Sequence, residues 1–379
     1  MKAKKQLQQK GIMKKIIFHL LAVIPIIIVL ISCGNHDDDI IIKTDYYGWA
    51  VGSNLDTGKG IILHTSDGGK SWISMSDSTQ LKAGLEDICI FDKNTLLAVG
   101  DKTSDGTPNV LKSIDGGKNW SVSGIGFLPN ISYNGIFKLN DQNVFIVGDT
   151  GSIYKSTDMA SSWMKIEVPV LYQERIFLRI AAKNTKDIWV VGDSYPQDST
   201  PIMLHTIDGG VNWERHDPVK DLNIVAASEG HYLGIKIFGN SIWAIGGFGK
   251  FVIRSADNGA TWTEITPSAG DADANDIFLL SETEAFVVTD YGGIFSTANG
   301  GTSWTQHKIP TNNWLLGIDI IEGNKLWLCG SAAGSNDHSS IFYSGNKGII
   351  WEEQTPTLLR ENLDLSLYKI RFIKVETQQ

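Results

Sequence analysis

Acidic and amide side chains that recur at a fixed spacing are the first candidates for chemistry in this chain of 379 residues. Seven segments share the frame Ser/Thr-x-Asp/Asn-x-Gly-x-x-Trp, and we call each segment a box. Repeated carboxylates could bind calcium or transfer protons, but an Asp in a tight turn also accepts backbone N–H bonds. Seven copies in equivalent turns favour this structural role. The residues concerned are Asp67, Asp115, Asp158, Asp208, Asp257, Asn299 and Asn346, followed by Trp72, Trp120, Trp163, Trp213, Trp262, Trp304 and Trp351.

A second group of polar and aromatic residues lies at or just before the first alternating segment of several repeats. Each of them is typical of a solvated rim, and together they form the predicted ligand-binding site. Two roles are predicted for Trp314. It either packs as a plug against the next repeat or forms an exposed stacking platform for a sugar or a partner side chain. The group comprises Trp314, Glu86, Asp87, Tyr133, Asn134, Arg179, Tyr232, Asn275 and Asp276.

The charged residues suggest two candidate glycosidase active sites. Glu86, Asp87 or Asp276 could supply the paired carboxylates of an inverting enzyme. Arg179, Arg215 and Arg254 are the candidates for the arginine triad of a sialidase, in which guanidinium groups bind a substrate carboxylate. Two of these arginines lie next to boxes, away from the rim, so we assign no catalytic residue.

Metal and cofactor chemistry has no recognisable frame in the sequence. The eight histidines are scattered, and neither His-x-His nor Cys-x-x-Cys occurs. No phosphate-binding loop leads from a strand into a helix, and no nucleophile elbow is visible. The sequence therefore predicts no metal site and no cofactor.

Composition excludes further classes. With 42% hydrophobic residues the chain is too apolar for disorder, and its net charge of −9 is opposite to that of a nucleic-acid-binding surface. Three cysteines cannot build a disulfide scaffold. Cys89 and Cys329 lie in apolar β patterns and are predicted to be buried free thiols.

The N-terminus has the pattern of a targeting segment. Six lysines precede an uncharged apolar run, and Leu30-Ile31-Ser32-Cys33 resembles a bacterial lipobox, so residues 1–33 are predicted to be a lipoprotein signal peptide with Cys33 lipidated. Either Met1 or Met13 could be the start, and a single transmembrane anchor is the alternative. Residues 34–39 form an acidic tether, and the chain beyond Cys33 has a net charge of −15. We expect a lipid-anchored protein of the cell envelope, at the outer membrane.

The elements that position these residues repeat with the boxes, whose tryptophans are 42 to 50 residues apart. Each unit has an alternating segment, a second segment ending in glycine, a third that leads into the box and a fourth that starts at the tryptophan. Four short strands per unit and seven units predict an all-β, seven-bladed β-propeller over residues 40–379. A β-solenoid is the alternative.

The two ends of the chain compete for one place in the predicted ring. Residues 40–43 align with an inner strand of the first blade, yet residues 367–373 repeat the inner-strand pattern. We expect the C-terminal strand to take the inner position and to close the ring.

One face of such a ring carries the loops after the second and fourth strands of each blade, and the boxes lie on the other face. The loops after the second strand are long in four blades. They are Ser53–Lys59, Asp101–Pro108, Asp193–Pro201 and Ser331–Ser339.

The boxes resemble the Asp-box repeat of bacterial neuraminidases. The longer frame is similar to the photosystem II stability/assembly factor-like propellers and, more distantly, to sortilin-type propellers. Met159-Ala160 replaces Gly-Gly, Asn299 and Asn346 replace Asp, and Lys347 replaces Gly, so we expect looser turns there. The chain has only six arginines, whereas an arginine-rich patch is expected in that family.

The resemblance implies a non-enzymatic scaffold that acts on a membrane-protein partner. We therefore expect a monomeric envelope lipoprotein that binds a protein or a glycan and no nucleic acid. A glycoside hydrolase of the sialidase-like or paired-carboxylate type is the alternative.

Overall fold

The computed structural model describes residues 42–75, 80–193, 200–224, 230–247, 251–268, 272–334 and 337–378. Two compact units divide the chain, one of residues 1–43 with 377–379 and one of Thr44–Glu376. The predicted signal peptide, the tether and Cys33 lie outside the described residues. Within the described ranges, no helix is both long enough and apolar enough to span a membrane.

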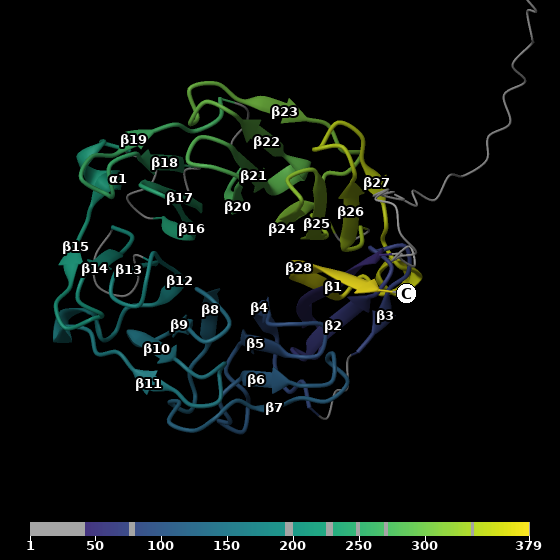
Figure 1. Ribbon diagram of the computed structural model, residues 1–379, viewed down its shortest axis with the longest axis horizontal. Coiled ribbons are helices and arrows are strands. Elements are labelled where there is room, and N and C mark those ends of the chain that lie inside the picture. The colour runs from purple at the N-terminus through teal and green to yellow at the C-terminus, as the bar shows by residue number, and fades with distance from the viewer. Residues whose placement is uncertain are drawn as a thin grey trace, which may run out of the picture. The chain divides into compact units, whose positions relative to one another are not determined.

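The large unit is a ring of seven four-stranded antiparallel sheets, which confirms the predicted β-propeller (Figure 1). The first blade contains β28 (Leu365–Gln378), β1 (Ile42–Asn54), β2 (Gly60–Thr65) and β3 (Ile73–Ser74). The second contains β4 (Leu85–Ile90), β5 (Leu96–Gly100), β6 (Val110–Ser113) and β7 (Ser121–Val122). The third contains β8 (Tyr133–Lys138), β9 (Val144–Gly148), β10 (Ser152–Ser156) and β11 (Met164–Lys165).

The remaining blades follow the same order. The fourth contains β12 (Phe177–Ala182), β13 (Ile188–Gly192), β14 (Met203–Thr206) and β15 (Glu214–Arg215). The fifth contains β16 (His231–Phe238), β17 (Ser241–Gly247), β18 (Phe251–Ser255) and β19 (Thr263–Glu264). The sixth contains β20 (Ala274–Leu279), β21 (Ala285–Thr289), β22 (Ile294–Thr297) and β23 (Thr305–His307). The seventh contains β24 (Trp314–Ile321), β25 (Lys325–Ser331), β26 (Ser340–Ser344) and β27 (Glu352–Glu353). The described helices are short: η1 (Val170–Tyr172), α1 (Pro218–Asp221), η3 (Asp290–Gly292) and α2 (Thr357–Glu361).

The hydrophobic core lies between neighbouring blades. Every residue of the second strands β5, β9, β13 and β21 is buried, because each blade is covered on both faces by its neighbours. This explains why these strands are continuously apolar instead of alternating. Cys89 and Cys329 are buried free thiols, as predicted, and burial raises the pKa of both to about 12.

The box turns are closed by side-chain to backbone hydrogen bonds. In the first box Thr65 Oγ1 donates to Asp67 Oδ1 over 2.7 Å and accepts from Gly69 N over 2.9 Å. The same Asp oxygen accepts from Ser71 N over 3.0 Å. The three boxes that depart from the pattern keep these bonds, so the expected loosening is not seen in their hydrogen bonding. The left-handed backbone is adopted there by Met159, Ala160 and Lys347.

The first blade combines both ends of the large unit. β28 lies at the inner edge of the sheet, and β1 is the second strand. Gly52 in β1 permits this approach, since a Cβ at that position would lie 1.8 Å from the carbonyl oxygen of Ser366. Phe372 in β28 stacks on Trp327 of the seventh blade with ring centroids 3.9 Å apart. The C-terminal strand therefore joins the last blade to the first.

We expect deletion of residues 363–379 to lower the melting temperature sharply, because the first blade would lose its inner strand. Phe372→Ala alone should cost about 3–5 kcal/mol of unfolding free energy, as for other buried aromatic residues. Thermal melts followed by circular dichroism and urea unfolding measure both effects. An unchanged melt of the truncated chain would contradict ring closure by β28.

Candidate functional site

The inner strands of the seven blades surround the ring axis and position the residues that the sequence singled out (Figure 1). In blades two to seven the inner strand has a bulge at the same place, for example between Leu85 and Asp87 and between Ala274 and Asp276. A bulge adds one residue and redirects the side chains beside it. The bulge residues include Glu86, Asn134 and Asn275.

Three inner-strand aspartates join neighbouring blades. Asp87 Oδ2 accepts from Ile136 N over 3.1 Å, and Asp276 Oδ2 accepts from Ile318 N over 3.2 Å. Asp319 Oδ2 accepts from Phe372 N over 2.6 Å. In each case the donor belongs to the inner strand of the next blade, so the carboxylates act as links around the ring.

Basic residues balance these aspartates, and we call Asp87, Asp276, Asp319, Lys236, Lys369 and Arg371 the central charge cluster. Lys369 Nζ lies 3.0 Å from Asp276 Oδ2 with both side chains buried, and Arg371 Nη2 lies 3.8 Å from Asp87 Oδ1. Burial alone would raise the pKa of Asp276, but Lys369 and Arg371 outweigh it and hold this pKa well below its usual range. Burial lowers the pKa of Lys369 to about 8 against the opposing effect of Asp276. The pair is therefore ionised at neutral pH.

Several predicted rim residues are not at a solvated rim. Tyr133 and Tyr232 are fully buried: Tyr133 donates to the carbonyl of Leu128 over 3.0 Å, and Tyr232 packs edge-on against Phe251. Both precede a bulge and fill the space between blades. Asp87, Asp276 and Asn134 are also buried.

The two bulge asparagines have equivalent roles. Asn134 Nδ2 donates to Asp149 over 3.1 Å and to the carbonyl of Phe177 in the next blade over 3.0 Å. Asn275 Nδ2 donates to Asp290 over 2.8 Å and to the carbonyl of Leu315 over 3.1 Å. The side chains of these asparagines connect successive blades and satisfy backbone carbonyls.

Glu86, Arg179 and Trp314 keep accessible surface. Burial and then the nearby Asp101 raise the pKa of Glu86 to about 7. Arg179 Nη1 donates to the carbonyls of Asn134 and Leu178 over 2.6 and 2.7 Å. Trp314, at the start of β24, is 39% exposed, which a plug packed into the next blade would not be.

Acidic residues directly follow several second strands, on the face opposite the boxes. Asp101, Asp149 and Asp290 come directly after β5, β9 and β21. Burial raises the pKa of Asp101, and the neighbouring Asp149 raises it further. Burial also raises the pKa of Asp290. These aspartates therefore place acidic side chains on this face, close to the cations Lys102 and Arg179.

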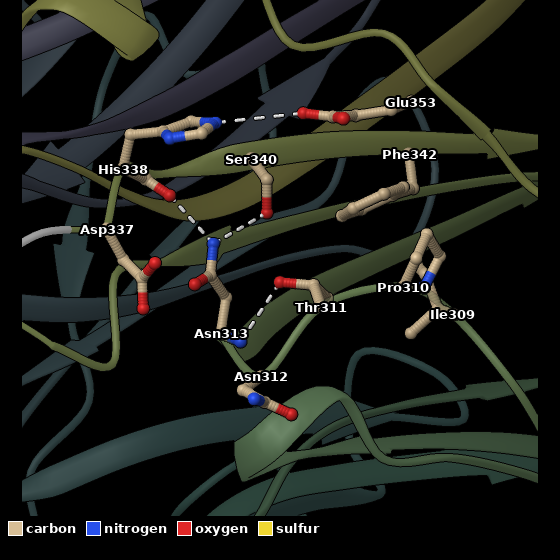
Figure 2. Close-up of a pocket in the computed structure, with 10 residues that line it drawn as sticks. All are labelled: Ile309, Pro310, Thr311, Asn312, Asn313, Asp337, His338, Ser340, Phe342 and Glu353. Carbon is tan, nitrogen blue, oxygen red and sulfur yellow. Dashed lines mark hydrogen bonds and ion pairs between the residues drawn. The ribbon is translucent and has the colours of Figure 1, made fainter.

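A pocket of about 450 Å³ lies on blade seven, lined by residues 309–313, which precede Trp314 in the chain, and by residues within 337–342 and Glu353 (Figure 2). Asn313 Nδ2 donates to the carbonyl of His338 over 2.7 Å and to Ser340 Oγ over 2.9 Å. Figure 2 shows Phe342, Pro310 and Ile309 together at one side of the pocket, with Asp337 and His338 at the other. The sequence predicted a long loop after the second strand of blade seven. Its contact with residues 309–313 is seen only in the folded structure.

The candidate arginines of a sialidase do not converge. Arg215 Nε donates to Asp217 over 2.8 Å in blade four. Arg254 Nε donates to Ser241 Oγ over 2.9 Å, and its guanidinium lies 5.4 Å from the ring centre of Trp243 in blade five. Arg179 lies on an inner strand. Because each guanidinium has a separate local partner, no carboxylate-binding triad forms from them.

We expect Asp276→Asn to destabilise the protein by about 3–5 kcal/mol, because it leaves the buried Lys369 ammonium without its partner. The double variant Asp276→Asn/Lys369→Met should regain part of this loss. Asp141→Asn is the matched control: its ion pair with Lys138 is exposed, and such pairs contribute about 0–1 kcal/mol. Urea unfolding measures all three, and native-like stability of the Asp276 variant would disprove the pairing.

The family model of the photosynthesis system II assembly factor YCF48 matches residues 31–169 and 160–308 of the chain. A comparison with curated protein sequences finds no match. Among solved structures, YCF48 bound to D1 peptide is 16% identical with a TM-score of 0.54, over 74% of this chain and 83% of that one.

YCF48 from Cyanidioschyzon merolae is 19% identical with a TM-score of 0.54, covering 73% of this chain and 85% of that one. A GH74 enzyme of Niastella koreensis is 17% identical with a TM-score of 0.50, over 82% of this chain but 56% of the enzyme. At these identities the structures support the propeller fold alone. The family model covers more than half of the sequence, and the chain therefore belongs to the photosynthesis system II assembly factor YCF48 family.

Proposed function

We propose that this protein is a non-enzymatic scaffold that binds a segment of a protein partner on the ring face carrying Glu86, Arg179 and Trp314. The main supporting observation is that some predicted site residues are buried and hydrogen-bonded, whereas others are accessible. Asp87 and Asp276 are occupied by backbone donors and cations, whereas Trp314 remains accessible. The residues that precede Trp314 in the chain line a pocket. A partly exposed tryptophan is typical of a binding anchor.

Membership of the assembly-factor family supports a protein partner, and a solved relative is described as bound to D1 peptide. For this chain we also propose a partner chemistry. The proposed binding face carries the acidic side chains of Glu86, Asp101 and Asp149, and the chain has only six arginines. A segment with lysine or arginine side chains suits this face better than an acidic one.

The glycosidase alternative has less support. A retaining or inverting mechanism needs two carboxyl groups that can reach one glycosidic bond. Asp87 and Asp276 each accept a backbone N–H from the next blade and face buried cations, so neither is available as a free acid or base. Glycan binding without hydrolysis remains an outcome that the binding experiment distinguishes.

We expect Trp314→Ala to weaken partner binding at least tenfold, because an aromatic anchor typically contributes 2 kcal/mol or more. Partners are captured with the full chain from solubilised envelopes, and affinities are measured on the recovered segment; a glycan array is run beside it. Ile114→Ala is the control, since Ile114 is exposed within the box of blade two, on the opposite face. Equal weakening by both variants, or glycan hydrolysis by the native chain, would overturn the proposal.

We also propose that the chain is a lipid-anchored envelope protein, with Cys33 carrying the lipid. Two or more acyl chains give stable membrane attachment. Cys33→Ala should then abolish the lipid mass on residue 33 and block maturation. Mass spectrometry of the membrane and soluble fractions checks this. An unmodified, uncleaved N-terminus in the native protein would favour the transmembrane-anchor alternative.

A further inference from the structure

Three potential metal ligands meet on blade four, on the left of the ring in Figure 1. His205 lies in β14, Glu214 in β15, and His216 directly follows β15. The strand register places His205 opposite Glu214. Since Glu214 and His216 are two residues apart on an extended segment, all three side chains share one face of the blade. Their ligand atoms all lie within 4.8 Å of one another.

Trp189 holds both imidazoles in place. It pairs with His205 across β13 and β14, and the two rings stack with centroids 3.9 Å apart and an interplanar angle of 14°. The ring of His216 lies 4.8 Å from the same indole. Trp189 is completely buried, so the histidines rest on a rigid surface. This preorganisation lowers the entropic cost of bringing the two ligands together.

The hydrogen bonds around the cluster suit a metal ion. Asp187 Oδ1 lies 3.0 Å from Nε2 of His205, which is the carboxylate–imidazole contact that orients metal-binding histidines. In the described part of the protein, Nε2 of His216 is buried without a hydrogen-bond partner. Its nearest carboxylate oxygen is Glu214 Oε2 at 3.9 Å. A buried polar atom of this kind calls for an explanation, and a bound ion provides one.

Blade one shows that this arrangement is not a by-product of the repeat. His64 is the counterpart of His205: it pairs with Trp49 and stacks on it with ring centroids 4.6 Å apart. The residue opposite His64 is Ile73, and His64 Nδ1 is 3.0 Å from the carbonyl oxygen of Gly48. Among the described residues, the stacked histidine of blade one therefore has no such ligand cluster, whereas blade four adds Glu214 and His216 to the pair.

We propose that His205, Glu214 and His216 form a Zn²⁺ site, with Asp187 orienting His205 and water completing the coordination. Two imidazole nitrogens and one carboxylate oxygen are a known ligand set for zinc. Ligand atoms around tetrahedral Zn²⁺ are roughly 3.5 Å apart at bond lengths near 2.1 Å. Side-chain rotation of Glu214, which is 75% exposed, brings its carboxylate to this distance from the two imidazoles.

Isothermal titration with ZnCl₂ on the metal-stripped full chain, purified in detergent without a histidine tag, tests the site. We expect one equivalent bound with micromolar or tighter affinity and a rise in melting temperature that saturates with zinc. Glu214→Gln and His216→Gln should each weaken binding at least tenfold. Asp187→Asn should weaken it about tenfold, as for other carboxylates behind a metal-binding histidine.

The controls separate this site from other histidines. His64→Gln removes the matched stacked histidine of blade one and should leave zinc affinity unchanged. His36→Gln removes the histidine beside the acidic run of residues 37–39 and should do the same. Glu214 is exposed, so its variant reports on binding even if His216→Gln fails to fold. No native binding below 100 μM, native-like binding by Glu214→Gln, or loss of binding in His36→Gln would each overturn the proposal.

Discussion

Contact between neighbouring blades is the constraint on which the rest of the structure depends. A single blade has two apolar faces and cannot bury either of them alone, so the sheets are stable only in a closed ring. Closure is completed where the seventh blade meets the first, through the stacking of Phe372 on Trp327 and the hydrogen bond from Phe372 N to Asp319. Phe372 belongs to β28, whereas Trp327 and Asp319 belong to β25 and β24 of the seventh blade. These strands come into contact because β28 joins the sheet of the first blade.

The central charge cluster extends this constraint to the polar groups of the inner strands. Charges buried near the axis must be paired, because an isolated ion in this environment carries a large desolvation penalty. Asp276 and Lys369 meet that requirement across two blades, and the aspartates also satisfy backbone donors. Asp87 and Asp276, two of the three residues that resemble a paired-carboxylate active site in sequence, are thus part of the structural framework. In the proposed function, binding is assigned to the accessible residues on the loop face, above all Trp314.

The outer parts of the blades carry fewer structural demands, since their last strands are two or three residues long and mostly exposed. The sequence can vary there without opening the ring. In blade four this freedom places Glu214 and His216 beside a histidine that already stacks on Trp189. The same repeat can therefore support the proposed partner-binding face and, independently, the proposed zinc site.

The repeats determined the fold from the sequence alone, because box spacing and strand periodicity are local patterns that each unit repeats. Seven blades of four strands followed directly, and so did the buried free thiols Cys89 and Cys329. The burial and the contacts of individual polar residues do not follow from local patterns. The bulges beside Tyr133 and Tyr232 accompany their burial in the core, and the neighbouring blade decides which groups Asp87 and Asn134 contact. His205 and His216 look scattered along the chain, yet the pairing of β14 with β15 brings them together. Only the tertiary structure settles such contacts, because they join residues of different strands and blades whose separation in sequence carries no periodic signal.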